Sequence, residues 1–119
     1  MNVEEIRDYC LRRKGVTEEF PFDEETLVFK VLGKIFLLMN IHEAEVSVNL
    51  KCDPEHAIVL RERYESVLPG YHMNKKHWNT VTYTGEFSAK DFYGMIDHSY
   101  SEVVKGMTRK MREELDQIV

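Results

Sequence analysis

The sequence predicts an α+β fold, a two-layer sandwich in which one antiparallel sheet of about four strands carries helices on one face. Two observations predict it. Stretches of alternating apolar and polar residues gather in the middle of the chain, and stretches with an apolar residue at every third or fourth position lie on either side of them. A chain of 119 residues can bury one hydrophobic core but not two. We therefore expect a single domain over residues 1–119.

The first element is a predicted helix over residues 3–13. Asn2 stands before it as an N-cap, and Glu5 completes a capping box three positions later. The cations at positions 12–14 suit the negative end of a helix dipole, and Gly15 follows as a C-cap residue. These signals give the helix both a start and an end.

An acidic loop is predicted over residues 17–25, which hold five acidic residues and no base. The sequence Phe20-Pro21-Phe22 interrupts it. Two aromatic rings around a proline favour an anchor that pins the loop to the core. A contact with a partner molecule is the alternative.

Three strands are predicted next, over residues 27–32, 35–39 and 45–51, paired as an antiparallel meander. Gly33-Lys34 fits a two-residue hairpin turn between the first two. The middle strand is apolar at every position, as expected when both of its faces are covered. The third strand alternates, so its polar residues should share the face that points away from the helices.

A second helix is predicted from Asp53-Pro54 to about residue 68, because Asp is a good N-cap and Pro is favoured at the first helical position. A fourth strand, rich in Thr, Val and Tyr, is predicted over residues 78–84. Ser88 and Ser99 each stand three residues before an acid, which is the capping-box spacing. We therefore expect two further helices with a break near residues 98–99.

Charge is unevenly distributed along the chain. The net charge of −5 argues against a nucleic-acid binder as the default, because phosphate neutralisation supplies most of the affinity for DNA and RNA. Residues 69–81, however, hold Lys75, Lys76, the only Trp and two of the five His, with no acid among them. A locally basic face on an acidic protein is therefore expected.

The chain has no run of about 18 apolar residues and starts with an acidic segment, so neither a membrane span nor a signal peptide is expected. Cys10 and Cys52 are predicted to be two isolated, reduced thiols. Together these features predict a cytoplasmic monomer that does not bind a membrane.

Catalytic and metal motifs are weak. The chain has no Gly-rich phosphate loop and no nucleophile elbow, so we expect neither enzyme activity nor a cofactor. His72 and His77 are five positions apart, which matches no usual metal-ligand spacing. Cys52 and His56, four apart at a helix start, form the one arrangement that a thiol-based reaction would use.

Several segments, in order over nearly the whole chain, resemble the MmcQ/YjbR family of small bacterial proteins. They are Phe20-Pro21-Phe22, Val28-Phe29-Lys30-Val31, Gly33-Lys34-Ile35-Phe36, Leu50-Lys51, Pro69-Gly70-Tyr71-His72-Met73-Asn74-Lys75-Lys76-His77-Trp78-Asn79 and Asp97-His98-Ser99-Tyr100. The resemblance implies a double-wing fold grouped with the frataxin-like (CyaY-like) proteins, and a DNA-binding label. Because frataxin-like proteins bind iron through acidic surfaces, the resemblance also offers an analogy to iron binding. The analogy requires acidic residues along the first helix, and in this chain they lie in a loop.

The binding hypothesis combines this resemblance with the outer sheet face. Lysines would contact phosphates and the aromatic or His rings would stack on bases, giving weak, salt-sensitive binding. The candidate nucleic-acid-binding residues are Lys30, Lys34, Lys51, Tyr71, His72, Asn74, Lys75, Lys76, His77, Trp78 and Asn79.

Three alternatives stay open for these residues. The outer face is polar in any antiparallel sheet that touches water. A lone Trp near a strand start is often a core anchor. A protein or a small anion, bound on the same face, is the alternative ligand to nucleic acid.

Overall fold

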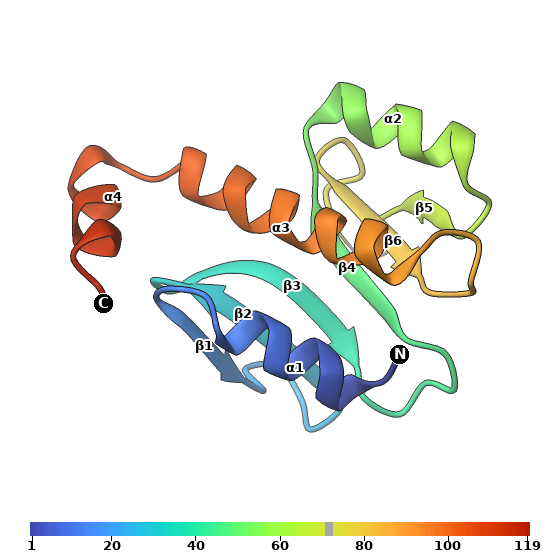
Figure 1. The fold of residues 1–119 in the computed structure, drawn as a ribbon, viewed down its shortest axis with the longest axis horizontal. Coiled ribbons are helices and arrows are strands. Elements are labelled where there is room, and N and C mark those ends of the chain that lie inside the picture. The colour runs from blue at the N-terminus through green and yellow to red at the C-terminus, as the bar shows by residue number, and fades with distance from the viewer. Residues whose placement is uncertain (71–72) are drawn as a thin grey trace.

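The computed structural model describes residues 1–70 and 73–119, and in these residues one six-stranded antiparallel sheet is combined with four helices (Figure 1). The α+β prediction is confirmed, with six strands where about four were expected. The helices are α1 (Val3–Leu11), α2 (Pro54–Arg63), α3 (Ala89–Lys105) and α4 (Arg109–Asp116). The strands are β1 (Val16–Glu19), β2 (Thr26–Val31), β3 (Lys34–Asn40), β4 (Ser47–Lys51), β5 (Val67–Pro69) and β6 (Trp78–Thr82).

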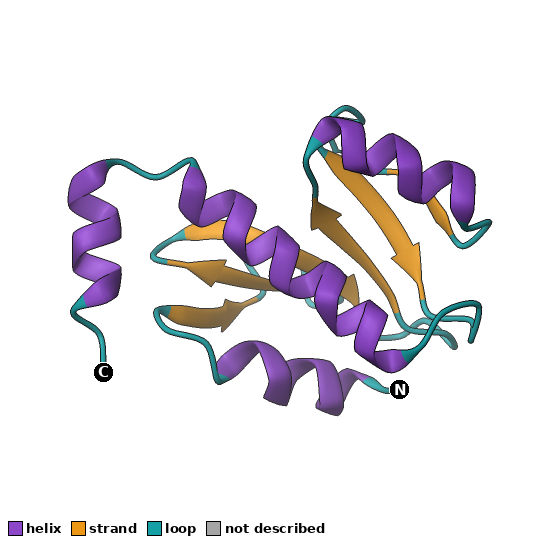
Figure 2. Ribbon diagram, turned by 45° about the horizontal axis from the view of Figure 1, so that its top comes forward, coloured by secondary structure: helices purple, strands orange, loops and turns teal. Residues whose placement is uncertain are grey.

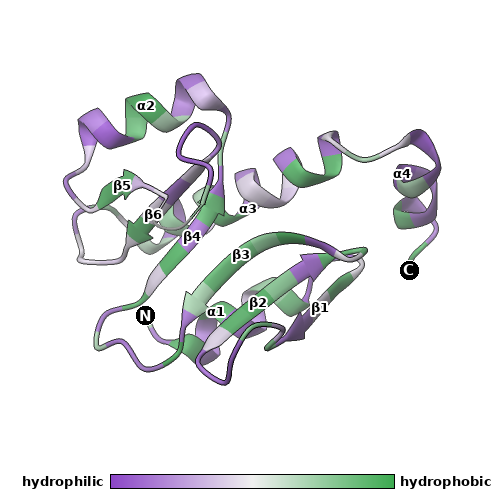
Figure 3. Cartoon of the chain, turned by 180° about the vertical axis from the view of Figure 1, so that it is seen from behind, coloured by the Kyte–Doolittle hydropathy of each residue, from purple (hydrophilic) through white to green (hydrophobic). Residues whose placement is uncertain are grey.

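The strand order is β1-β2-β3-β4-β6-β5, and every neighbouring pair is antiparallel. β3 and β4 pair over only three positions, from Leu37 opposite Leu50 to Met39 opposite Val48. The sheet therefore consists of two three-stranded halves joined at a short seam, as Figure 3 shows from behind. Figure 2 shows α3 crossing one face, with α1 and α2 on either side of it.

The core lies between the sheet and the helices. Phe29 and Leu37 are fully buried from the sheet side, and Phe92 and Ile96 are buried from α3. The middle strand is covered on both faces, as predicted, because residues 36–39 are all buried. Within the described chain, no helix is long and apolar enough to cross a membrane.

Two short edge strands replace segments that were predicted otherwise. β1 forms inside the expected acidic loop, because the guanidinium of Arg7 pairs with the inward-pointing carboxylate of Glu18. α2 ends five residues earlier than predicted, at Arg63, where Tyr64 turns to an extended conformation. The chain then pairs with β6 as β5.

The loop anchor predicted for Phe20 and Phe22 is wrong. The two residues are 47% and 65% exposed. The loop is held by Asp23 instead, whose carboxylate accepts the backbone N–H groups of Glu25 and Thr26 at 2.8 and 2.7 Å. This turn supplies the hydrogen bonds that order the loop, so the rings do not have to.

The predicted helix break at residues 98–99 is also wrong, because α3 continues through it. Ser99 is fully buried and does not cap a helix. Its hydroxyl donates to the carbonyl of Phe36 on β3 and accepts the backbone N–H of Lys51 on β4 at 2.8 Å. The chain instead breaks at residues 106–108, where the Thr108 side chain caps α4.

Replacing Ser99 tests this bridge between the two halves of the sheet. Ser99→Ala should lower the free energy of unfolding by about 2–4 kcal/mol, because two buried backbone groups lose their partner. Ser101→Ala, at an exposed position on the same helix, should change it by less than about 0.5 kcal/mol. Urea unfolding of both variants measures the difference, and equal midpoints would contradict the bridge.

Gly70 is required for close packing against β6. An added Cβ would lie 2.8 Å from the Cβ of Trp78 and 2.9 Å from its carbonyl oxygen. Gly70→Ala should therefore destabilise the protein by about 1–3 kcal/mol, since backbone must move. Thermal unfolding measures the effect, and an unchanged melting temperature would show that the strand can shift freely.

Candidate functional site

The predicted lysines do not form one surface. Lys30 is paired with Glu19 on the neighbouring strand, so its charge is already neutralised. Lys34 begins β3 at the far end of the β2–β3 hairpin. Figure 1 shows that this turn lies away from the loop between β5 and β6 that carries Lys75 and Lys76.

A smaller group from the predicted set does lie together. Lys51 and Trp78 are direct cross-strand partners, and the alternation of β4 and β6 places both on the outer face. Lys75 and Lys76 are exposed in the loop just before Trp78. Asn74 orders that loop, since its side-chain oxygen accepts the N–H of Lys76 at 2.9 Å.

Two other predicted residues have structural roles. The carbonyl of His77 accepts the N–H of Cys52 at 2.7 Å, and the His77 side chain is half-buried. Asn79 is 1% exposed and points to the inner face, where Arg61 donates to its side-chain oxygen at 2.6 Å. Asn79 therefore does not belong to the outer face. Tyr71 and His72 lie outside the described residues.

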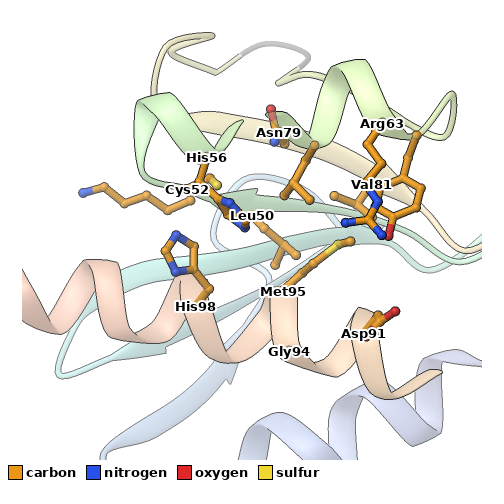
Figure 4. Close-up of a pocket in the computed structure, with 13 residues that line it drawn as sticks. Leu50, Cys52, His56, Arg63, Asn79, Val81, Asp91, Gly94, Met95 and His98 are labelled. Atoms are coloured by element: carbon orange, nitrogen blue, oxygen red, sulfur yellow. The ribbon is translucent and has the colours of Figure 1, made fainter. Parts of the chain in front are cut away.

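The best-formed concave site lies on the opposite side of the sheet from these lysines, between α2, α3 and the strands β4 and β6. It is a cavity of about 320 Å³ (Figure 4). Its apolar centre is formed by Leu50, Val81 and Met95, and Figure 4 shows the Met95 side chain directed from α3 toward the strands. Charged and titratable side chains stand at both ends.

At one end, His56 of α2 and His98 of α3 face each other, with ring centroids 5.3 Å apart (Figure 4). The Nε2 atom of His98 accepts the backbone N–H of Asp53 at 3.2 Å. This bond assigns the proton of the neutral ring to Nδ1. Burial lowers the pKa of His98, although the nearby Glu102 opposes the shift. His98 is therefore neutral at physiological pH.

At the other end, Arg63 of α2 lies near Tyr64, with its guanidinium carbon 5.3 Å from the ring centroid. Both residues line the cavity, together with Asp91 of α3. Arg61, two residues earlier, ties α2 to the β6 side by donating to Asn79 and to the carbonyl of Lys75. Arg61 thereby holds α2 in place as one wall of the cavity, while Arg63 is exposed at the mouth of the cavity.

Gly94 lines the cavity in the middle of α3. A glycine inside a helix costs about 0.5–1 kcal/mol relative to alanine. No described atom lies within 4 Å of the position that a Cβ would occupy. Packing therefore does not require the glycine, and its effect is to leave space beside the cavity.

Cys52, four residues before His56, is a buried free thiol at the start of α2. Burial raises the pKa of the Cys52 thiol to about 11, and the adjacent Asp53 carboxylate adds to the shift. The residues from 1 to 70 and from 73 to 119 contain no group of three His, Cys, Asp or Glu side chains placed to hold a metal ion.

No pattern in the sequence predicts this cavity. In the sequence His56 stands out only beside Cys52, and His98 only as part of the family motif. The residues come from four elements, and neither helical nor strand periodicity places one element against another. A weak signal does exist, because Leu60 and Tyr64 are four positions apart and so lie on one side of the predicted helix, and both line the cavity.

Comparison with known proteins places the chain in a family. The family model YjbR matches residues 11–102. The chain is 30% identical over 118 residues to the uncharacterized protein YjbR of Escherichia coli K12, covering 99% of this chain and all of that protein. It is 40% identical over 112 residues to the uncharacterized protein YyaQ of Bacillus subtilis, covering 82% of this chain and 93% of that one.

Two solved structures have folds similar to that of this chain. A Deinococcus radiodurans protein of the domain family DUF419 superposes with a TM-score of 0.90 at 41% identity, covering 97% of this chain and 88% of that one. A Pseudomonas syringae protein superposes with a TM-score of 0.73 at 26% identity, covering 87% of this chain and 99% of that one. The resemblance found in the sequence is confirmed: this chain belongs to the YjbR family.

Proposed function

We propose that this protein acts by binding, without catalysis, and that its ligand is a small organic anion held in the cavity between α2 and α3. The observation that carries the proposal is the cavity itself. Its volume of about 320 Å³ lies at the lower end of the range of small-molecule sites. An apolar centre with a few polar groups at the rim is the composition typical of such sites.

The hydrogen-bond donors of the lining favour an anion. Arg63 contributes a positive charge at the mouth and Asp91 contributes a negative one, while the side chain of Lys51 belongs to the outer face of the sheet. The guanidinium of Arg63 can form two parallel hydrogen bonds to a carboxylate or phosphate. His56 and His98 offer ring N–H donors at the other end of the cavity. The ligand should therefore be a flat or aliphatic body of a few carbon atoms that carries one acidic group.

Phenyl phosphate is a suitable probe because it joins an apolar ring to an anion. We expect an amide-shift titration to move the resonances of β4, β6, α2 and α3 around the cavity. Gly94→Leu should abolish these shifts by filling the space beside Met95, while Gly94→Ala should retain most of the binding. Arg63→Gln should weaken binding about tenfold or more, since it removes a charge-assisted hydrogen bond.

The two glycine variants also provide the folding control. Gly94→Ala should raise the free energy of unfolding by about 0.5–1 kcal/mol, the gain of alanine over glycine in a helix. Lost binding in Gly94→Leu then cannot be attributed to unfolding if its thermal transition matches that of Gly94→Ala. Unchanged binding in Gly94→Leu, or shifts confined to the outer face, would contradict the cavity as the site.

Nucleic acid is the second candidate ligand, on a different surface. The supporting observation is the cross-strand pairing of Lys51 with Trp78, next to exposed Lys75 and Lys76. One aromatic ring among three amines fits a short single strand, with the base stacked on the ring and the phosphates on the amines. Lys30, Lys34 and Asn79 are not part of this smaller surface.

Salt dependence tests this second candidate. Three phosphate contacts to a single-stranded oligonucleotide predict a slope of log K against log salt of about −2. Lys75→Glu/Lys76→Glu should reduce binding at low salt to near the detection limit, and Lys90→Glu, an exposed cation on α3, should not. Equal binding by both variants would exclude this surface.

We also propose a cytoplasmic location and a monomeric state. The support for the location is that Cys10 and Cys52 are both buried free thiols, which suits a reducing compartment.

A further inference from the structure

The loop between β1 and β2 exposes two aromatic rings that the fold does not use. Phe20 and Phe22 are 47% and 65% exposed, and the Asp23 turn holds the loop without them. An exposed phenylalanine leaves apolar surface in contact with water, which is unfavourable unless something covers it. Two such rings on one ordered loop indicate a contact surface.

A groove begins beside the first of these rings. Phe20 lines it together with Val3 of α1, Leu27 of β2 and Ile41 after β3. Its volume is about 580 Å³. The ion pair of Arg7 with Glu18 contributes to the lining. The groove is therefore apolar inside and offers room for a large side chain.

The surroundings of the groove are acidic. The backbone N–H of Ile41 donates to the carbonyl of Glu25 at 3.0 Å, which holds the β1–β2 and β3–β4 loops side by side. Figure 1 shows both loops close to the start of α1. The exposed acids of these two loops are Asp23, Glu24, Glu25, Glu43 and Glu45.

These five carboxylates differ from their neighbours in the sheet. Glu18 and Glu19 are neutralised by Arg7 and Lys30. In the described residues no cation forms an ion pair with any of the five. We call the five acids together with Phe20 and Phe22 the acidic aromatic patch.

We propose that the acidic aromatic patch docks a cationic segment of a partner protein. Lysine or arginine side chains of the segment would meet the five carboxylates, and one large apolar side chain would enter the groove beside Phe20. Charge complementarity selects this partner. Phosphate backbones would be repelled, and two copies meeting through this patch would bring like charges together.

The probe for this site is a synthetic peptide of seven residues that alternates lysine with leucine or phenylalanine. We expect it to shift the amide resonances of residues 19–25 and 41–45, with an affinity that falls as salt rises. The matched control peptide has glutamate in place of each lysine and should not bind. Equal shifts from both peptides, or shifts spread over the whole molecule, would overturn the proposal.

Variants separate charge from apolar contact. Glu24→Lys/Glu25→Lys should weaken the lysine peptide at least about tenfold, and so should Phe20→Ser/Phe22→Ser. The control is Glu62→Lys/Glu114→Lys, which changes the same net charge at exposed positions on α2 and α4. The proposal fails if this control weakens binding as much as the patch variants.

Self-association through the acidic aromatic patch must be distinguished from binding of a cationic partner. Sedimentation of the free protein over a wide range of concentration should give the monomer mass for the wild type and for Phe20→Ser/Phe22→Ser. A dimer that the double serine variant abolishes would assign the patch to a second copy of this chain and overturn the proposal. All four positions in these patch variants are exposed, so an unchanged amide spectrum elsewhere is expected for each variant.

Discussion

The buried hydroxyl of Ser99 is the contact on which the two halves of the sheet depend. β3 and β4 pair over three positions only, so their remaining backbone groups need another partner. Ser99 supplies it to both strands, at the carbonyl of Phe36 and the N–H of Lys51. α3 is thereby fixed across the seam. The cavity lies beside this point, between α3 and the half of the sheet that α2 covers.

The same residue shows why the sequence predicted most of the fold but not its centre. Alternation and helical spacing identified α1, β2, β4 and β6, and an unbroken apolar run identified β3, which is covered on both faces. Ser99 with Glu102 has the spacing of a helix cap, and a serine hydroxyl suits a cap and a strand bridge equally well. Only the tertiary position of the serine decides between them. Likewise β1 and β5 are too short for alternation to distinguish β1 from a loop or β5 from the end of the preceding helix.

The candidate site was harder to predict than the fold for a related reason. Whether Trp78 or Asn79 faces outward depends on a register of one residue, and the structure assigns the outer face to Trp78. His56 and His98 face each other at the cavity although 42 positions separate them in the sequence. No local sequence pattern predicts a contact between residues that far apart. What the sequence did identify is the exposed pair Lys75 and Lys76, whose position at the surface follows from local composition alone. The frataxin-like grouping stays a prediction.

The two proposed sites are expected to bind ligands of opposite charge. The net charge of −5 argues against nucleic acid as the default ligand. The five carboxylates of the acidic aromatic patch equal that whole excess, so the rest of the molecule is balanced. Figure 1 places the patch loops and α2 on opposite sides of α3. Salt screens charges over about 8 Å at physiological ionic strength. Under the two proposals, an anion would meet the guanidinium of Arg63 and a cationic segment would meet the carboxylates beside Phe20, at sites on opposite sides of α3.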